Sequence, residues 1–552
     1  MLKIKILFLL ITIFFVAIIV KLFMIQVLNT YSYSGDYLQS QKIYPERGKI
    51  YDVNNHLLVT NQTKYLVYAE PKKIEKKNYI VRDLEKVLEI GEATIEAKLD
   101  LSKDWVRVKS GVSKDKKDEI SKLHINGIGF QEEQYRAYPE ASLSAHLLGF
   151  VGKNKSGEDI GYFGIEGYYE KELTGLAGMM KSERDLLGRP IFIGTQEKVD
   201  PQNGGDLILT IDSAVQTLVK KKLLKGLETY EAKEGCVIVA DPNTMKIMSM
   251  VCLPDFDPDQ YYLFSEDLFK NAAISNLYEP GSTFKPLVVA VAIEEKAIKP
   301  DDFMQEDGPI TIGEYTIRTW NDKYEGKISM TRVLEKSSNV GMVYIGSKLG
   351  NDKLYQYLKK YRFGKETGID LQGETSGYLK DQKDWYPIDY STVSFGQGIA
   401  VTPIQMIRAF TALINGGNLL KPYVVDKVVT NNNERKQEAT VVSKVISDRT
   451  SQIIKKMLVS TVENGELKWL KPIGYKIGGK TGTAQIPIKG HYDESKTIAS
   501  FIGFAPADKP KFIALVIVRE PKASQWGSET AAPIFFDIAK ELLLYYNIAP
   551  DR

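Results

Sequence analysis

The sequence has little excess of either charge and no segment of biased composition. Among its 552 residues, 73 lysines and arginines nearly balance 70 aspartates and glutamates, which leaves a net charge of +3. No long basic face interleaved with aromatic residues is present, so nucleic acid is not an expected partner. No internal repeat or low-complexity segment is evident, and with 43% apolar residues the chain is neither disordered nor fibrous. This length allows roughly two to four compact units.

The sequence also lacks the helix that should follow a nucleotide-binding phosphate loop. Residues 474–481 (Gly-Tyr-Lys-Ile-Gly-Gly-Lys-Thr) match the phosphate-loop pattern G-x-x-x-x-G-K-T. That loop needs a helix after it, because the helix dipole and backbone N–H groups bind the phosphate. Here Gly482 and the strand-like Gln485-Ile486-Pro487-Ile488 follow instead. Nucleotide binding is therefore not expected.

Charge is also absent from most of the N-terminus. Residues 6–20 carry none, and apolar residues resume after Lys21. As one helix, residues 6–27 would be about 33 Å long, enough to cross a bilayer with Lys21 reaching the interface. Lys3 and Lys5 precede this segment, which favours a cytoplasmic N-terminus and an extracytoplasmic body. A cleaved signal peptide is the alternative, but no small-x-small cleavage site follows. We therefore expect an uncleaved single-pass anchor over residues 1–28.

Three short motifs occur in an order and spacing that indicate one reaction. They are Ser-Thr-Phe-Lys at 282–285, Ser-Ser-Asn at 337–339 and Lys-Thr-Gly-Thr at 480–483, and the second and third begin 55 and 198 residues after the first. Each motif alone is most simply an exposed helix face, a cap or a loop. Together they indicate acyl transfer through a serine ester.

Ser282 and Lys285 are the candidate nucleophile and base. An apolar run follows, so the pair is expected at the start of a helix, where positions i and i+3 share a face. A lysine with the usual pKa of about 10.4 is almost fully protonated at pH 7. The site must therefore lower that pKa by burial or by a second cation, for which Lys480 is the candidate. Backbone N–H groups at the helix start can stabilise an oxyanion.

The other two motifs supply groups that could bind a peptide. The sequence around Lys480 is typical of a strand, and an edge strand can pair with an extended peptide while a cation and hydroxyls bind its carboxylate. Ser337 and Asn339 lie in a predicted helix-to-loop segment. There a hydroxyl can relay a proton and an amide can hold a peptide group.

Composition and pattern change near residue 206. Before it, short strand-like pieces alternate with charged helices. After it come two hairpin signals, 237–240 with 247–251 and 498–504 with 512–518. A final helix carries an apolar stripe that would pack on the sheet, formed by Ile534, Phe535, Ile538, Leu542 and Leu543. These patterns predict an α+β fold with an N-terminal domain over 29–205. A second domain over 206–552 is predicted to be an antiparallel sheet flanked by helices, the Ser282 helix among them.

From about Tyr44 to Phe536 the chain resembles the class B penicillin-binding proteins, which are membrane-anchored peptidoglycan D,D-transpeptidases. Beyond the three motifs, the resemblance rests on segments in both predicted domains. They are Arg-Gly-Lys-Ile-Tyr-Asp at 47–52, Gly-Ile-Glu-Gly-Tyr-Tyr at 164–169, Leu-Thr-Ile-Asp at 209–212, Pro-Asp-Phe-Asp-Pro at 254–258, Glu-Pro-Gly at 279–281, Phe-Gly at 363–364, Thr-Gly-Ile-Asp-Leu at 367–371, Phe-Gly-Gln-Gly at 395–398 and Thr-Pro at 402–403. Within the family the chain looks most similar to the division transpeptidases and their sporulation counterparts.

The resemblance implies an elongated N-terminal pedestal that docks partners, followed by a penicilloyl-serine transferase domain. It implies that Ser282 attacks the penultimate D-alanine carbonyl of a stem peptide, that D-alanine leaves, and that an amine of a neighbouring strand resolves the ester. Lys285 would act as base, Ser337 would relay the proton and Asn339 would orient the substrate. The implied carboxylate-binding residues are Lys480, Thr481, Gly482 and Thr483, and the implied oxyanion hole is formed by the backbone N–H groups of Ser282 and Thr483. No cofactor is required for this acyl transfer.

The resemblance also implies partners and leaves alternatives open. The expected ligands are stem peptides ending in D-Ala-D-Ala, β-lactams and the membrane. A separate glycan polymerase and morphogenetic membrane proteins are expected partners, because no glycosyltransferase domain precedes the chain. Septal synthesis and spore-cortex synthesis both fit. A serine β-lactamase shares the motifs but not the long N-terminal domain, a β-lactam sensor would need several membrane spans, and a catalytically weak scaffold stays open.

Cys236 and Cys252 are the only cysteines. They flank the first predicted hairpin turn symmetrically about residue 244, so they are expected to face each other across two strands. Three states are open. They are two buried free thiols, a cross-strand disulfide, which an extracytoplasmic location permits, and a structural zinc site with His491 and Asp493 as further ligands.

Overall fold

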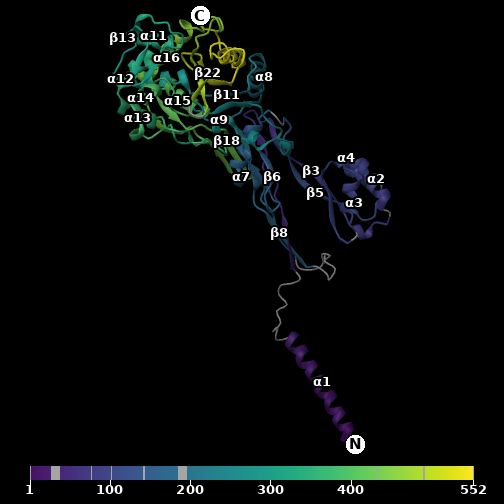
Figure 1. Ribbon diagram of the computed structural model, residues 1–552. Coiled ribbons are helices and arrows are strands. Elements are labelled where there is room, and N and C mark those ends of the chain that lie inside the picture. The colour runs from purple at the N-terminus through teal and green to yellow at the C-terminus, as the bar shows by residue number, and fades with distance from the viewer. Residues whose placement is uncertain are drawn as a thin grey trace. The chain divides into compact units, whose positions relative to one another are not determined.

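The computed structural model describes residues 2–26, 38–75, 77–100, 102–140, 143–183, 196–431, 433–488 and 491–550 (Figure 1). The chain forms two compact units. The first comprises Met1–Glu46 and Gly175–Asn203, and the second comprises Arg47–Thr174 and Gly204–Arg552. Much of the N-terminal half therefore folds together with the C-terminal part of the chain.

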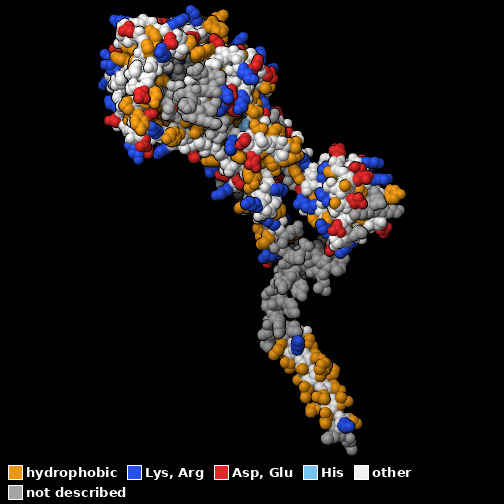
Figure 2. All heavy atoms as spheres, in the orientation of Figure 1, with side chains coloured by type: hydrophobic (Ala, Val, Ile, Leu, Met, Phe, Trp, Pro, Cys, Tyr) orange, Lys and Arg blue, Asp and Glu red, His pale blue; other side chains and the backbone are white. Residues whose placement is uncertain are grey.

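The first unit contains the N-terminal helix and a small sheet. Helix α1 (Leu2–Gln26) includes the apolar stretch Lys3–Met24, which is long enough to cross a membrane and is not buried by the rest of the chain. Hydrophobic side chains cover most of its surface (Figure 2). Within the described ranges it is the one helix with this length and composition, which confirms the predicted apolar N-terminal helix. Strands β1 (Leu38–Ile43), β8 (Gly178–Glu183) and β9 (Gln196–Val199) form an antiparallel sheet in the order β1-β8-β9.

The N-terminal part of the second unit is built on the long strand β3 (Leu57–Ala69). It pairs antiparallel with β2 (Ile50–Tyr51), β4 (Val106–Val112) and β5 (Ile128–Ala137). Three helices gather at one end of β3 and β5 (Figure 1). They are α2 (Lys77–Leu88), α3 (Glu92–Lys98) and α4 (Lys114–Lys122), and their apolar faces share a separate core with the strands.

One sheet continues from this part into the C-terminal part. Strand β10 (Asp206–Leu209) pairs in parallel with β2 and antiparallel with β18 (Val425–Thr430), which in turn pairs with β19 (Asn433–Lys436). Leu207 of β10 lies opposite Ile50 of β2, and both side chains are fully buried. Segments about 150 residues apart in the chain therefore share one sheet and one core.

The C-terminal part is organised around a five-stranded antiparallel sheet in the order β12-β11-β23-β22-β21. The strands are β11 (Glu234–Ala240), β12 (Ile247–Leu253), β21 (Gly478–Ile488), β22 (His491–Ala505) and β23 (Phe512–Arg519). Successive side chains point to opposite faces. Val237 belongs to a core with α8 (Ser213–Thr229) and α17 (Ala531–Tyr545), and Ile238 belongs to a core with α10 (Lys285–Glu294) and α15 (Pro403–Ile414). Both predicted hairpins, the packing of the last helix and the α+β architecture are confirmed.

Helix α10 at the centre of the second unit is buried on all sides from Lys285 to Ile293. The remaining helices and strands complete this unit. They are α5 (Ala145–Leu148), β6 (Phe150–Lys153), β7 (Asp159–Tyr162), α6 (Gly164–Tyr168), α7 (Glu170–Thr174), α9 (Ala272–Ser275), β13 (Phe303–Glu306), β14 (Ile310–Ile312), β15 (Tyr315–Ile317), β16 (Gly326–Ser329), α11 (Met330–Glu335), α12 (Asn339–Leu349), α13 (Asn351–Lys360), α14 (Pro387–Ser394), β17 (Asn418–Leu420), β20 (Val441–Lys444) and α16 (Asp448–Glu463).

Candidate active site

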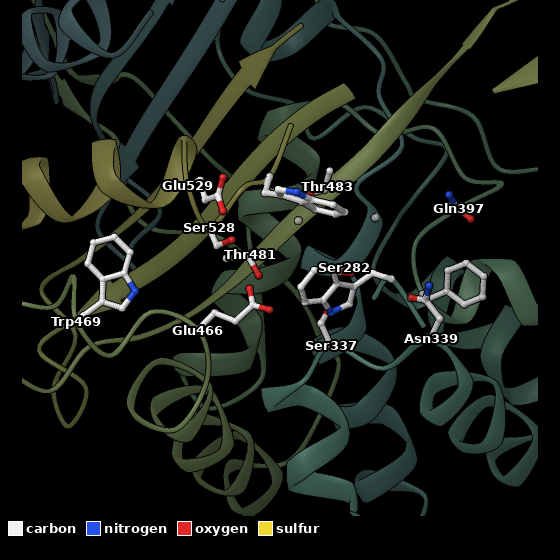
Figure 3. Close-up of a pocket in the computed structure, with 15 residues that line it drawn as sticks. Ser282, Ser337, Asn339, Gln397, Glu466, Trp469, Thr481, Thr483, Ser528 and Glu529 are labelled. Atoms are coloured by element: carbon white, nitrogen blue, oxygen red, sulfur yellow. The ribbon is translucent and has the colours of Figure 1, made fainter. Parts of the chain in front are cut away.

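The three sequence motifs meet in one cleft of about 320 Å³ (Figure 3). Its lining includes Ser282, Ser337, Asn339, Thr481, Gly482 and Thr483. Lys285 and Lys480 are buried behind these residues, with 0% and 3% of their surface exposed. The structure therefore brings together all the residues predicted from sequence as catalytic or substrate-binding.

Ser282 lies in a single 3-10 turn, Gly281–Thr283, just before α10. Gly281 has φ +51° and donates its N–H to Gly396 O at 2.9 Å. Gly396 has φ +84°, and a Cβ at this position would collide with Gly281 O. Only glycine fits both the conformation and the close approach. The segment around Gly396 thus holds the turn that presents Ser282, and the predicted loop leading into a helix is present.

Lys285 contacts the middle motif directly. Its Nζ donates to Ser337 O at 2.6 Å and to Asn339 Oδ1 at 2.8 Å, and it lies 3.2 Å from Ser337 Oγ. Burial lowers the pKa of Lys285 well below its usual value, the charge of Lys480 lowers this pKa further, and the charge of Glu306 opposes both. A lysine whose pKa is lowered in this way can be neutral near pH 7 and accept a proton.

The middle motif joins α11 to α12, so a second helix begins where the sequence predicted a loop. Ser337 has φ +58°, a left-handed conformation that costs a non-glycine residue about 1–3 kcal/mol. Ser338 caps α12, because its Oγ accepts the Gly341 N–H at 2.8 Å. Asn339 Nδ2 donates to Arg318 O at 2.9 Å, which fixes the amide with Oδ1 toward Lys285.

Lys480 lies on β21 with its ammonium group beside Thr481. Its Nζ is 3.1 Å from Thr481 O and 3.2 Å from Thr481 Oγ1. Burial lowers the pKa of Lys480 to about 8, against the opposing charge of Glu466. Lys480 is therefore mostly cationic at neutral pH, and its charge also acts on Lys285.

Strand β21 lies at the edge of the five-stranded sheet and borders the cleft. Its neighbour is β22, and among the described residues no strand pairs with its other edge. Unpaired backbone groups of an edge strand can bind an extended peptide. A Cβ on Gly482 would lie 2.6 Å from Ser500 Oγ and 2.8 Å from Thr283 Cγ2, so β21 approaches the Ser282 turn too closely for a side chain here. Thr483 Oγ1 accepts the Gly527 N–H at 3.0 Å.

Sequence reasoning missed the aromatic and acidic lining of the cleft. Three of the five tryptophans line it, namely Trp320, Trp469 and Trp526. Trp320 and Trp526 pack against each other with ring centroids 5.1 Å apart. Glu466 and Glu529 line the same cleft (Figure 3). These residues come from loops, and no local pattern in the sequence sets them apart.

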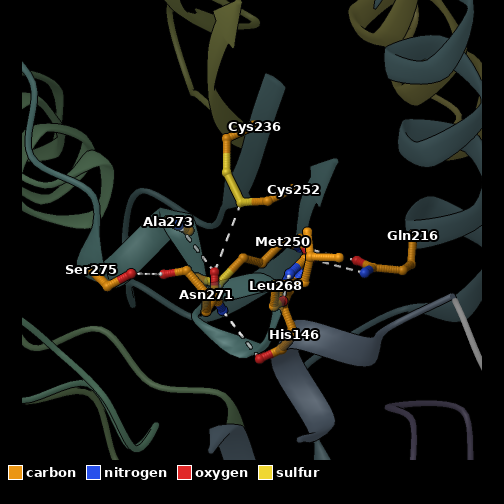
Figure 4. The surroundings of a disulfide bond; sticks show 9 residues. All are labelled: His146, Gln216, Cys236, Met250, Cys252, Leu268, Asn271, Ala273 and Ser275. Atoms are coloured by element: carbon orange, nitrogen blue, oxygen red, sulfur yellow. Dashed lines mark hydrogen bonds between the residues drawn. A yellow bond between two sulfur atoms is a disulfide. The ribbon is translucent and has the colours of Figure 1, made fainter. Parts of the chain in front are cut away.

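The two cysteines form a disulfide across β11 and β12 (Figure 4). Cys236 lies opposite Cys252 in the strand register, with Cα atoms 4.1 Å apart, so the predicted facing arrangement is confirmed. Of the three states that the sequence left open, namely two free thiols, a disulfide and a zinc site, the structure contains the disulfide. Both sulfur atoms are in this bond, so neither is a free ligand for zinc beside His491 and Asp493. His491 and Asp493 pair through their backbones with Ile488 and Ile486 of β21, while their side chains lie outside the described residues.

Comparison with known proteins gives matches over both parts of the chain. The family described as "Penicillin-binding Protein dimerisation domain" matches residues 42–209, and the "Penicillin binding protein transpeptidase domain" matches residues 235–540. Stage V sporulation protein D of Bacillus subtilis (strain 168) is 34% identical over 518 residues, which cover 92% of this chain and 79% of that protein. Peptidoglycan D,D-transpeptidase FtsI of Escherichia coli (strain K12) is 29% identical over 524 residues, covering 93% and 86%.

Solved structures show the same fold. Penicillin Binding Protein 2X from Streptococcus thermophilus superimposes with a TM-score of 0.77 at 25% identity, covering 92% of this chain and 80% of that chain. A peptidoglycan synthetase from Bifidobacterium adolescentis superimposes with a TM-score of 0.75 at 27% identity, covering 94% and 98%. Both matched domains, their order and the fold agree with the resemblance found in the sequence. The chain therefore belongs to the class B penicillin-binding proteins, the family of transpeptidases that carry a dimerisation domain before the penicillin-binding domain.

Proposed function

We propose that this protein is a peptidoglycan D,D-transpeptidase that cross-links stem peptides through an acyl-enzyme on Ser282. The observation that carries the proposal is the assembly of the three motifs in one cleft around a buried lysine of lowered pKa. Relatives named as peptidoglycan D,D-transpeptidases support it. The reaction requires only groups of this chain and its peptide substrates.

In the first step Lys285 acts as general base. As a neutral amine it has two hydrogens, which Ser337 O and Asn339 Oδ1 can accept, and one lone pair, which is free to take the Ser282 proton. Ser282 Oγ bonds to the carbonyl carbon of the penultimate D-alanine. The oxyanion that forms is stabilised by the backbone N–H groups of Ser282 and Thr483, each such donor being worth about 3 kcal/mol.

The tetrahedral intermediate then collapses. The C–N bond breaks, the proton held by Lys285 passes to the departing D-alanine nitrogen with Ser337 Oγ as relay, and a serine ester remains. An amine of a second stem peptide attacks this ester. Its proton goes to Lys285 and returns to Ser282 Oγ as the new amide forms, so the enzyme is regenerated.

Substrate recognition is assigned to β21 and the middle motif. The peptide lies along the edge of β21, its terminal carboxylate binds Lys480 with the hydroxyls of Thr481 and Thr483, and Asn339 orients a peptide group. Gly482 allows the peptide backbone to approach between these side chains. A β-lactam presents a carboxylate and a strained amide to the same groups, so it is expected to acylate Ser282 and block the site.

The rest of the chain is proposed to place this site at the membrane. Residues 1–28 act as an anchor with a cytoplasmic N-terminus, because Lys3 and Lys5 precede the apolar stretch. Residues 29–205 act as a pedestal for partner proteins, and residues 206–552 carry the extracytoplasmic chemistry. A separate glycan polymerase and morphogenetic membrane proteins are the proposed partners, in septal or spore-cortex wall synthesis.

The test uses the purified full-length chain in detergent. Incubation with a fluorescent penicillin is expected to label one residue, which peptide mapping by mass spectrometry places at Ser282. A donor stem pentapeptide and an acceptor peptide are expected to give a cross-linked product with release of one D-alanine per cross-link. Ser282→Ala is the control and should do neither. Labelling retained in Ser282→Ala, or a wild-type protein that neither labels nor cross-links, would overturn the proposal.

A further inference from the structure

Glu306 is a buried carboxylate behind the middle motif. It is the last residue of β13, its side chain is fully buried, and it is not among the residues that line the cleft. Strand β13 pairs with β16, where Glu306 lies opposite Gly326. A carboxylate in such a place needs partners, because an unpaired buried charge is strongly unfavourable.

Both oxygens of Glu306 have polar neighbours, and these include the middle motif. Ser338 Oγ donates a short hydrogen bond to Oε1, and Thr319 Oγ1 lies 3.4 Å from the same oxygen. On the other side, Glu325 N–H lies 3.4 Å and Lys336 Nζ lies 3.7 Å from Oε2. The Lys336 side chain is itself only 10% exposed. The carboxylate thus ties the centre of the Ser-Ser-Asn motif to a buried ion pair.

Ser338 stands between the two residues that contact Lys285. Ser337 O lies 2.6 Å and Asn339 Oδ1 lies 2.8 Å from Nζ, and Ser337 has the left-handed φ of +58°. A non-glycine residue stays in that conformation only when its surroundings hold it there. Ser338 is held on two sides, by Glu306 and by the N–H of Gly341. Releasing Ser338 from Glu306 would therefore disturb both contacts to the lysine.

Glu306 also contributes charge. The charged groups that act on Lys285 are Lys480 of β21 and Glu306 of β13, while Ser337 and Asn339 are its neutral contacts. The negative charge of Glu306 opposes the lowering of the Lys285 pKa by burial and by Lys480. Lys336, at the end of α11, is the cation that faces Glu306 in turn, and its Nζ also lies 3.3 Å from Glu325 Oε1.

We propose that Glu306 is a positioning residue for the acyl transfer, which fixes Ser337 and Asn339 against Lys285 through Ser338 and places a negative charge behind the lysine. The inference rests on the proposed function, in which Lys285 takes the proton of Ser282. Ser338 connects Glu306 to the two residues that contact Lys285, and the carboxylate acts on Lys285 through its charge. The two contributions can be separated experimentally.

The experiment measures the rate of acylation by a penicillin from acid to alkaline pH, using the full-length protein in detergent. Glu306→Gln keeps the shape and removes the charge. The rising part of its curve of acylation rate against pH, the acid limb, should move to lower pH, because Lys285 loses a proton more easily without the carboxylate. Its plateau should stay close to that of the wild type, because the amide oxygen of glutamine can still accept the hydrogen bond from Ser338. Ser338→Ala keeps the charge and removes this hydrogen bond, so its plateau should fall about 10- to 100-fold, as a small misplacement at a reacting group does, while the midpoint of the limb stays in place.

A purely structural role gives a different result. If Glu306→Gln melts at a lower temperature but keeps the wild-type midpoint and plateau, the inference is wrong. Should Glu306→Gln fail to fold, Lys336→Gln takes its place. It removes the cation beside Glu306 and should move the limb to higher pH, and an unmoved limb in this variant also overturns the inference.

The outcomes distinguish this inference from the proposed function. A wild-type protein acylated at Ser282, whose acylation is lost in Lys285→Ala, supports the proposed function. An unshifted limb in Glu306→Gln then rejects the role of Glu306 alone. Acylation of wild-type protein at a residue other than Ser282 rejects both.

Discussion

Arg136 Nε donates a 2.6 Å hydrogen bond to Glu166 Oε1, and both side chains are buried, at 3% and 0% exposed. Arg47 Nε binds the other carboxylate oxygen at 2.8 Å. The three residues come from the start of the second unit, from β5 and from α6. The ion cluster therefore connects separate segments of the N-terminal part. Arg47 is three residues before β2, which pairs with β10 at the start of the C-terminal part.

Glu166→Ala is expected to lower the free energy of unfolding by about 3–5 kcal/mol, because it leaves two guanidinium groups without their buried partner. Denaturant unfolding followed by circular dichroism measures this change. Lys72→Ala is the control, since the Lys72–Asp104 pair is largely exposed and contributes little. Equal midpoints for the two variants would contradict the role given to the buried cluster.

The same cluster predicts an acid dependence. Burial alone would raise the pKa of Glu166, but Arg136 and Arg47 outweigh it and lower this pKa below the usual value. A carboxyl whose pKa is lower in the folded state stabilises the protein above its unfolded-state pKa of about 4.3, and this stabilisation is lost as the pH falls through the folded-state value. The stability difference between wild type and Glu166→Gln should therefore be full near pH 7 and shrink below about pH 4.

Lys285→Ala is expected to reduce the rate of acylation by about 10²- to 10⁴-fold, which is the usual cost of removing a general base. Because the pKa of Lys285 is lowered, the wild-type rate should rise with pH as the ammonium loses its proton and reach a plateau below the ordinary lysine pKa of about 10.4. Lys285→Arg is the matched control, since it retains the length and charge but stays protonated. If either variant acylates at the wild-type rate, the base is another group.

The lowered pKa of Lys480 predicts that substrate binding weakens at alkaline pH. Burial lowers its pKa to about 8, so the cation that binds the substrate carboxylate disappears as the pH rises above that value. The KM for a peptide ending in D-Ala-D-Ala should increase there. A peptide with an amidated C-terminus has no carboxylate and should bind weakly at every pH. A KM for the free acid that stays constant from pH 7 to about pH 9 would refute this role.

Removal of the disulfide is expected to lower the stability of the protein without changing its rate of acylation. Cys236 and Cys252 are 16 residues apart, and closing a loop of that size stabilises a folded protein by about 3 kcal/mol. A Cys236→Ala, Cys252→Ala double variant should unfold at correspondingly lower denaturant and still acylate at the wild-type rate under native conditions. A reductant should then destabilise the wild type but not the variant.

Local patterns predicted much of the site and of the C-terminal fold. The alternation Ile486-Pro487-Ile488 identified a strand, and β21 runs through it to Ile488, which also removes the phosphate-loop interpretation of residues 474–481. Pro487 is tolerated there because β21 is an edge strand. The symmetry of Cys236 and Cys252 about their turn predicted that they face each other. These predictions depend only on neighbours in sequence and on the two-residue period of a strand.

Long-range pairing could not be predicted in the same way. The parallel pairing of β2 with β10 joins Ile50 to Leu207, and no short pattern specifies which strands meet across such a distance. The pair Glu306-Asp307 is typical of an exposed turn in sequence. Only the fold shows that the Glu306 carboxylate is buried. Strand register places the two cysteines opposite each other, but it does not determine whether they are oxidised to a disulfide.

The tight fit at Gly482 limits how this enzyme could evolve resistance to β-lactams. A side chain there would push against Ser500 on one side and against the Ser282 turn on the other, so it would move the nucleophile as well as the drug. Selection therefore has little freedom on the strand that both substrate and antibiotic share. Changes that discriminate between the two are therefore expected at other residues that line the cleft, namely Trp320, Glu466, Trp469, Trp526 and Glu529.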